Sequence, residues 1–127
     1  YGNLVLVVDK NRCQGCRLTS ETIRDDNLGE RIASFGWDVR EVENGNDMLQ
    51  LYETLRDLPE ATPEHRKPVC LVLHTTKGCG IQYMEDGMAK WHAGGIGDDK
   101  LEETYASIQT KLDAQLARTD RLIAEAE

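Results

Sequence analysis

The sequence has no apolar run that approaches the roughly 18 residues needed to cross a membrane, and no signal-peptide pattern at its start. It is also poor in basic residues, with 15 Lys and Arg against 23 Asp and Glu and a net charge of -8. Because phosphate backbones are bound by clustered Lys and Arg, this balance disfavours a nucleic-acid surface. We therefore expect neither a membrane nor a nucleic acid as a partner.

What is present is typical of one soluble domain, or of a large piece of one. The 127 residues are 39% hydrophobic and 30% charged, which leaves enough apolar material for a core. A core strand is predicted almost directly after Tyr1, so we expect the chain to be a fragment or one part of a split enzyme. Four cysteines without a secretory signal indicate free thiols in a reducing compartment, and therefore a cytoplasmic location.

Three short segments predict the strands of an α/β fold, and the first and third are continuous apolar runs. Continuous Val and Leu runs are typical of strands that are covered on both faces. The alternation of strand and helix patterns favours right-handed crossovers, and so a mainly parallel sheet with flanking helices. Cys70 lies inside one of the runs and is predicted to be a small core residue. The segments are Leu4–Val8, Trp37–Val42 and Val69–Leu73.

Two amphipathic patterns predict the helices between these strands. The first is followed by Gly36, a typical stop signal, and the second is preceded by Asn46 and Asp47, either of which is placed to cap it. Apolar residues that recur with the helical period lie on one face of each helix. The predicted apolar faces are Leu28, Ile32 and Phe35 in the first helix, and Met48, Leu51 or Tyr52, Leu55 and Leu58 in the second.

A long charged helix is predicted after Asp98. Its apolar residues form a narrow stripe, which is typical of a helix that packs on a neighbouring element or a partner chain. We treat residues 1–127 as one partial domain and residues 98–127 as its helical extension. The stripe consists of Leu101, Tyr105, Ile108, Leu112, Gln115 or Leu116, and Leu122.

Two loops leave the carboxyl ends of predicted strands, where mainly parallel sheets bind their ligands. One carries Asn11, and the other runs from Thr75 to Gly97. The second is predicted to be a long irregular loop, and loops of that length are usually functional or disordered. Gly78 and Gly80 at its start permit a positive φ and a close approach of the backbone to a ligand, although their spacing is not that of a Walker A motif.

Cys13 and Cys16 form a C-x-x-C, which raises the alternative of a zinc or redox site. Structural zinc generally has four ligands, and only Cys79, His74 or His92 are available to complete the set. A redox pair usually opens a helix, whereas residues 17–19 are predicted to continue a loop. Two loop cysteines without a special task are therefore the favoured interpretation.

Asn11 and His92 are the other candidates for a site. An amide oxygen just beyond a buried parallel strand suits Mg²⁺, which prefers hard oxygen ligands shared with phosphate, but Asn at such a place is also a common turn residue. His92 follows Trp91 in a Gly-rich segment and is either a donor to a ligand or a surface histidine. His74, at the end of a strand, is predicted to line a pocket or to pack.

Four ordered segments of the sequence resemble the transketolase family. "NLVLVVDKN" is similar to the end of the thiamine-diphosphate motif, whose last member is the Asn after the strand. "ASFGWDVREVENGND", "KPVCLVLHTTKGCGIQYMED" and "KWHAGGI" resemble three later family stretches. The match runs from about Asn3 to about Ile108. It implies a partial thiamine-diphosphate-binding fold, from the C-terminal part of the diphosphate-binding domain or subunit.

The resemblance implies a role for particular residues. Thiamine diphosphate would be held through Mg²⁺ (or Ca²⁺), with the Asn11 side-chain oxygen and the Cys13 backbone carbonyl as metal ligands. Gly15 and Gly78 would lie along the cofactor, and His92 would face the diphosphate and the reacting end of the substrate. This chain departs from the family in lacking the upstream Gly-Asp-Gly, in carrying Gly-Cys-Arg at residues 15–17, and in having Ala93 after His92.

By the same resemblance, the chain would belong to a transketolase that transfers a two-carbon ketol unit between sugar phosphates of pentose phosphate metabolism. Its partners would be the remainder of the enzyme, either a pyrimidine-binding domain or a C-terminal subunit, in a homodimer or heterotetramer. Alone it would be inactive. The alternatives are a related thiamine-diphosphate enzyme with another substrate, a cofactor-free binding module that uses the long helix, and the Cys-based zinc or redox module.

Overall fold

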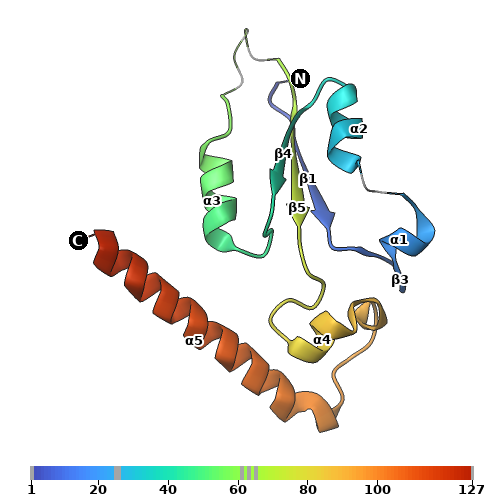
Figure 1. The fold of residues 1–127 in the computed structure, drawn as a ribbon, viewed down its shortest axis with the longest axis vertical. Coiled ribbons are helices and arrows are strands. Elements are labelled where there is room, and N and C mark those ends of the chain that lie inside the picture. Colours follow the sequence, from blue (N-terminus) through green and yellow to red (C-terminus); the bar gives the residue numbers. More distant parts are fainter. Residues whose placement is uncertain (1, 25–26, 61, 63, 65, 127) are drawn as a thin grey trace.

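A three-stranded parallel sheet forms the centre of the molecule in the computed structural model, which describes residues 2–24, 27–60, 62, 64 and 66–126. The strands are β1 (Val5–Lys10), β4 (Asp38–Val42) and β5 (Val69–His74), in the order β1-β5-β4. Both neighbours of β5 run parallel to it, so all three carboxyl ends meet at one edge (Figure 1). The predicted α/β fold with a mainly parallel sheet is confirmed.

The core lies on β5, because this strand has a neighbour on each side. Val69, Cys70, Leu71 and Val72 are each no more than 2% exposed. Cys70 is a core residue as predicted, and burial raises the pKa of its thiol.

The first strand is not covered on both faces, contrary to the prediction. Leu4, Val5, Leu6 and Val7 remain 40–53% exposed. The physical reason is the place of β1 at the edge of the sheet: it pairs with β5 alone, and the flanking helices pack beside β4 instead. Its continuous apolar run therefore indicates a buried surface that the described residues do not supply.

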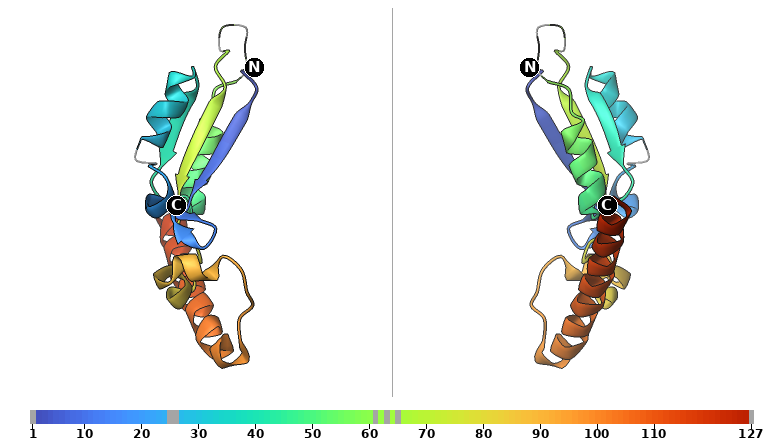
Figure 2. Two further views of the ribbon diagram at one scale, coloured as in Figure 1. Left: turned by 90° about the vertical axis from the view of Figure 1, so that its right-hand side faces the viewer. Right: turned by 90° about the vertical axis from the view of Figure 1, so that its left-hand side faces the viewer.

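The two predicted helices are α2 (Leu28–Ser34) and α3 (Met48–Arg56), which lie on opposite faces of the sheet (Figure 2). Asp47 caps α3 by accepting from the backbone N–H groups of Leu49 and Gln50. Gly36 has φ +86 just after α2, as a stop signal requires. Phe35 was expected on the inner face of α2 but is 82% exposed, because the helix ends at Ser34 and the chain turns away there.

Two stretches that were predicted to be irregular contain secondary structure. The hairpin β2 (Cys13–Gln14) and β3 (Arg17–Leu18) is followed at once by the short helix α1 (Thr19–Thr22), so residues 17–19 do not continue a loop. Residues 75–97 contain α4 (Gln82–Asp86) and the 3-10 helix η1 (Met88–Trp91). Both elements are too short to show a helical period, and the many glycines around them favour a loop prediction.

The C-terminal part is the 3-10 helix η2 (Asp98–Lys100) followed by the predicted long helix α5 (Leu101–Ala126). This helix lies beyond the carboxyl edge of the sheet (Figure 1), and most of its apolar stripe is exposed to solvent. No helix in the described ranges is both long and apolar enough to span a membrane. The division of the chain at residue 98 stays a prediction.

Candidate functional site

A pocket of about 470 Å³ lies at the carboxyl edge of the sheet. It is formed where the loops after β1, β4 and β5 meet, which is the edge at which parallel sheets bind ligands. Asn11 from the first loop and Gly78 from the third both line it, so two of the predicted site residues are brought together. The lining residues are Asp9, Asn11, Asn46, Thr75, Thr76, Lys77, Gly78, Cys79, Ile81 and Met84.

Asn11 is oriented by hydrogen bonds at both ends of its amide. Its Oδ1 accepts from the backbone N–H of Cys13 at 2.9 Å, and its Nδ2 donates to Asp9 Oδ2 at 3.2 Å. Arg12, which lies between Asn11 and Cys13, has φ +64. This left-handed conformation folds the chain back so that the Cys13 N–H can reach Asn11 Oδ1. The Asn11 oxygen is thus held at the start of the loop by contacts within the chain.

The pocket wall also contains the polar residues Asp9, Asn46 and Thr75, which the sequence pattern did not indicate as site residues. Thr75 Oγ1 donates a short hydrogen bond to Asp9 Oδ1, and Asn46 Oδ1 accepts from the backbone N–H of Thr76 at 2.7 Å. Asn46 follows β4, a third strand whose carboxyl end lies at the same edge. The strand order could have indicated Asn46 as a site residue, whereas the sequence pattern indicated only a possible helix cap.

The bend at residues 78–80 has the backbone that its glycines predict. Gly78 has φ +78, and a Cβ there would lie 2.5 Å from Met84 Cβ. Gly80 has φ +105, and its N–H donates to Glu85 Oε1 at 2.6 Å. The absence of side chains at these two glycines therefore lets the chain turn back against α4.

Cys13 and Gly15 lie in the β2–β3 hairpin rather than in the wall of this pocket. Cys13 shares with Asn11 another pocket of about 240 Å³, which residues of α1 and α2 also line. Gly15 forms the hairpin turn with φ +59, and a Cβ there would meet open space. The structure therefore places Cys13 directly beside Asn11, and Gly15 at the exposed tip.

His92 is exposed and is not among the residues that line the 470 Å³ pocket. It follows η1, which contacts both strands of the hairpin that carries Cys13. The ring of Trp91 packs edge-on against Tyr83, with 5.2 Å between the ring centroids. His74 also points to a partner outside the pocket, since its Nε2 pairs closely with Glu41.

The residues that would complete a zinc or redox site do not gather. Within the described ranges no three His, Cys, Asp or Glu side chains are grouped as a metal site would require. Cys13 is half-buried, Cys16 is exposed, and neither is in a disulfide.

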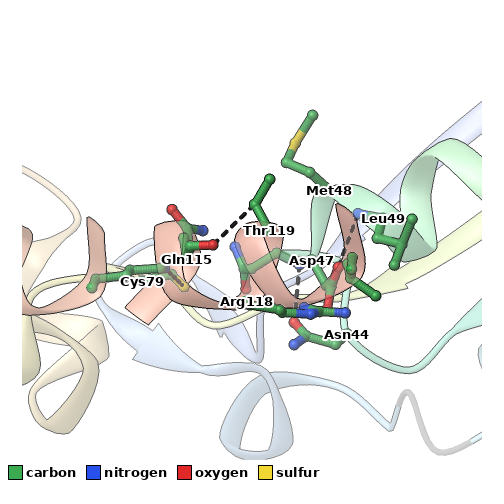
Figure 3. Close-up of a pocket in the computed structure, with 11 residues that line it drawn as sticks. Asn44, Asp47, Met48, Leu49, Cys79, Gln115, Arg118 and Thr119 are labelled. Carbon is green, nitrogen blue, oxygen red and sulfur yellow. Dashed lines mark hydrogen bonds and ion pairs between the residues drawn. The ribbon is translucent and has the colours of Figure 1, made fainter. Parts of the chain in front are cut away.

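A second pocket, of about 390 Å³, separates the start of α3 from α5 (Figure 3). Arg118 Nη1 on α5 donates to Asp47 Oδ2 at 2.5 Å across it. This guanidinium, more than any other group, holds the pKa of the Asp47 carboxyl below its usual range. The same pocket is lined by Cys79, which also lines the pocket at the sheet edge.

Comparison with known proteins identifies what the chain is similar to. Residues 1–120 match the family described as transketolase, thiamine diphosphate binding domain. An apulose-4-phosphate transketolase subunit from Phocaeicola vulgatus is 37% identical over 111 residues, which cover 87% of this chain and 38% of the relative. The protein of the same name from Actinobacillus succinogenes is 34% identical over 90 residues, which cover 71% of this chain and 30% of the relative.

A more distant relative is Transketolase 1 of Saccharomyces cerevisiae, which is 32% identical over 79 residues, 62% of this chain and 11% of the relative. No solved structure gives a significant match. The chain spans well under half the length of the curated relatives that it matches.

Proposed function

This chain belongs to the transketolase family, and we propose that it is part of the diphosphate-binding half of an enzyme that transfers a two-carbon ketol unit between sugar phosphates. The observation that carries the proposal is the pocket at the carboxyl edge of the sheet, which brings the Asn11 amide and the bend at Gly78 into one wall. Two loops 67 positions apart in sequence meet there, as the family resemblance requires of a site that binds a metal and a diphosphate together.

The groups present in the pocket fit thiamine diphosphate with Mg²⁺ or Ca²⁺. The side-chain oxygens in the pocket belong to the Asp9 carboxylate, the Asn11 and Asn46 amides and the Thr75 hydroxyl. Both cations prefer such hard oxygen ligands. An amide oxygen has two lone pairs, and only one of those on Asn11 is used by the Cys13 N–H. Gly78, which has no side chain, lines the pocket beside them.

The proposed roles are those that the family resemblance implies for these residues. Asn11 Oδ1 and the Cys13 carbonyl hold the metal, while backbone atoms at Gly78 and Gly15 lie along the cofactor, which supplies an electron sink for the bond that is broken. His92 acts as the catalytic donor near the diphosphate and the substrate. The contact of η1 with the hairpin that carries Cys13 supports this role for His92. His92 follows η1 directly, so it lies near the loop of Asn11 and Cys13.

Two relatives are named as subunits of a transketolase, and their names support a partner for this chain in the form of a second polypeptide. We propose that a pyrimidine-binding domain or C-terminal subunit completes the site, in a homodimer or heterotetramer. The exposed faces of β1 and α5 leave apolar surface for such contacts. The cytoplasmic location stays a prediction.

A second substrate is favoured by the names of the same relatives, which are apulose-4-phosphate transketolases. Apulose 4-phosphate is therefore a candidate beside the ketose phosphates of pentose phosphate metabolism. Rates of the complete enzyme with each class of donor decide between them, and the donor with the higher kcat/KM is the one that the site accepts.

The proposal is tested by calorimetric titration of thiamine diphosphate, with Mg²⁺ in excess, into the complete enzyme that contains this chain. We expect saturable binding that Asn11→Ala weakens by at least tenfold, since loss of an ordered metal ligand costs more than about 1.4 kcal/mol. Asn27→Ala is the matched control, because Asn27 stands before α2 and its side chain makes no capping hydrogen bond. Equal affinities of the two variants would overturn the proposal.

A further inference from the structure

Cys79 and Lys111 form a close pair that the proposed function does not use. Lys111 Nζ on α5 donates to Cys79 Sγ at 2.7 Å, over 32 positions of sequence. The lysine stem passes close to the neighbouring glycine, since a Cβ at Gly80 would lie 3.1 Å from Lys111 Cδ. The bend at residues 78–80 and α5 together therefore position an ammonium group against one particular thiol.

This thiol is within reach of small molecules. Cys79 is half-buried and lines two pockets, one at the sheet edge and one beside α5 (Figure 3). The other cysteines provide internal comparisons, because Cys70 is buried in β5 and Cys16 is exposed in the hairpin turn. If exposure alone governed reactivity, Cys16 would react first.

We propose that Cys79 and Lys111 act as a thiolate–ammonium pair that makes Cys79 the preferred site of oxidation by hydrogen peroxide. The thiolate is the nucleophile of thiols, and an adjacent ammonium favours that anion. The Cys79 thiolate attacks one peroxide oxygen, so that an S–O bond forms and the O–O bond breaks. The departing hydroxide takes a proton from the Lys111 ammonium. The products are a sulfenic acid, water and a neutral amine, with sulfur oxidised and peroxide reduced by two electrons.

The position of the pair gives the oxidation a consequence for the site. Cys79 follows Gly78 directly, and both line the pocket at the sheet edge. An added oxygen on Sγ displaces the Lys111 ammonium from the sulfur and so disturbs the bend that carries Gly78. If the proposed function holds, peroxide therefore restrains cofactor binding through a residue that is not itself a ligand.

The test measures the oxidation alone, without cofactor, so that its outcome is independent of the proposed function. The full chain is treated with hydrogen peroxide at pH 7 in the presence of dimedone, which traps sulfenic acids, and peptide mass spectrometry gives a labelling rate for each cysteine. We expect Cys79 to be labelled at least about fivefold faster than Cys16, because one nearby charge has an effect of about this size at a solvated site. Lys111→Gln should remove this difference in labelling rate.

Two further variants separate charge from packing. Lys111→Arg keeps a cation beside the sulfur and should retain most of the Cys79 labelling rate. Lys100→Gln removes a cation from η2, directly before α5, and should leave the Cys79 labelling rate unchanged. Labelling of the buried Cys70 in Lys111→Gln would show that this variant has lost its fold. In that case the Cys79 labelling rate of Lys111→Arg decides: a retained rate supports the inference and a lost rate overturns it. Equal labelling of Cys79 and Cys16, or an unchanged Cys79 rate in Lys111→Gln, overturns the inference.

Discussion

At the scale of single residues, the wall of the pocket is built from side chains that satisfy backbone groups of the loops. The Asn11 amide accepts from Cys13 and the Asn46 amide accepts from Thr76, so each loop is held by a polar side chain at a strand exit. Sequence alone could indicate Asn11, because only Asp9 and Lys10 separate it from the end of an apolar run. It could not indicate Asn46, because only the strand order β1-β5-β4 places the end of β4 beside the loop after β5.

Gly78 carries the first prediction at this scale. Gly78→Ala adds a Cβ 2.5 Å from Met84 and keeps a residue with a side chain at φ +78. We expect a loss of about 2–3 kcal/mol in the free energy of unfolding, from left-handed strain together with the clash. Urea unfolding followed by circular dichroism measures it.

Gly36→Ala is the control for the strain, because Gly36 has φ +86 and nothing within 4 Å of an added Cβ. It should cost only the left-handed penalty of about 1 kcal/mol. Equal losses in the two variants would contradict the close contact with Met84.

At the scale of elements, the contact between α3 and α5 predicts a dependence of stability on pH. Arg118 holds the pKa of Asp47 below its usual range in the folded chain. Because the folded-state pKa lies below the unfolded value, this stabilisation is present above the unfolded pKa and is lost as the pH falls through the folded pKa. We expect the free energy of unfolding to fall between about pH 5 and pH 2, with about 0.5–1 kcal/mol of the loss due to this pair.

Two substitutions at Asp47 separate its two roles. Asp47→Asn keeps an acceptor for the N–H groups at the start of α3 but removes the charge, so its stability should depend less on pH over that interval. Asp47→Ala also removes the cap, which costs about a further 1 kcal/mol at pH 7. Urea titrations at several pH values measure both effects, and an unchanged pH dependence in Asp47→Asn would show that the Arg118 contact does not stabilise the fold.

The central strand predicts a contrast between two leucines. Leu71 on β5 is 1% exposed, whereas Leu116 on α5 is 54% exposed. Leu71→Ala should lower the free energy of unfolding by about 2–5 kcal/mol, since it leaves a cavity in the core. The same change at Leu116 should cost no more than about 0.5 kcal/mol. Chemical denaturation of both variants checks this, and similar losses would mean that α5 buries its stripe against the chain.

The sequence predicts the elements of this fold better than it predicts their burial. The Val and Leu runs correctly indicate β1 and β5, and the Asp47 cap and Gly36 stop signal correctly bound two helices. The exposure of β1 could not be anticipated, because hydrophobicity states what a strand can bury and not what covers it. Likewise α4 and η1 are too short for a helical period to emerge among the glycines of residues 75–97.

At the scale of the whole molecule, exposed apolar surface lies on two separate elements, β1 and α5. The chain matches only 38% of the length of the relative from Phocaeicola vulgatus. It also lacks the Gly-Asp-Gly of the family motif. If the proposed function holds, β1 and α5 are the surfaces that other parts of the enzyme would cover.

If the proposed function holds, we predict that residues 1–127 alone bind thiamine diphosphate at least about tenfold more weakly than the complete enzyme, because the resemblance implies a further cofactor contact from the Gly-Asp-Gly that this chain lacks. Parallel calorimetric titrations of the two proteins with Mg²⁺ in excess measure the difference. Equal affinities would mean that the described pocket is sufficient by itself.

The most direct test of the central claim is a crystal structure of the complete enzyme with thiamine diphosphate and Mg²⁺. The account predicts a metal ion about 2.1 Å from both Asn11 Oδ1 and the Cys13 carbonyl oxygen, which is the usual Mg²⁺–oxygen distance, with the diphosphate beside Gly78. A metal bound by the Cys13 sulfur, or located away from Asn11, would contradict it.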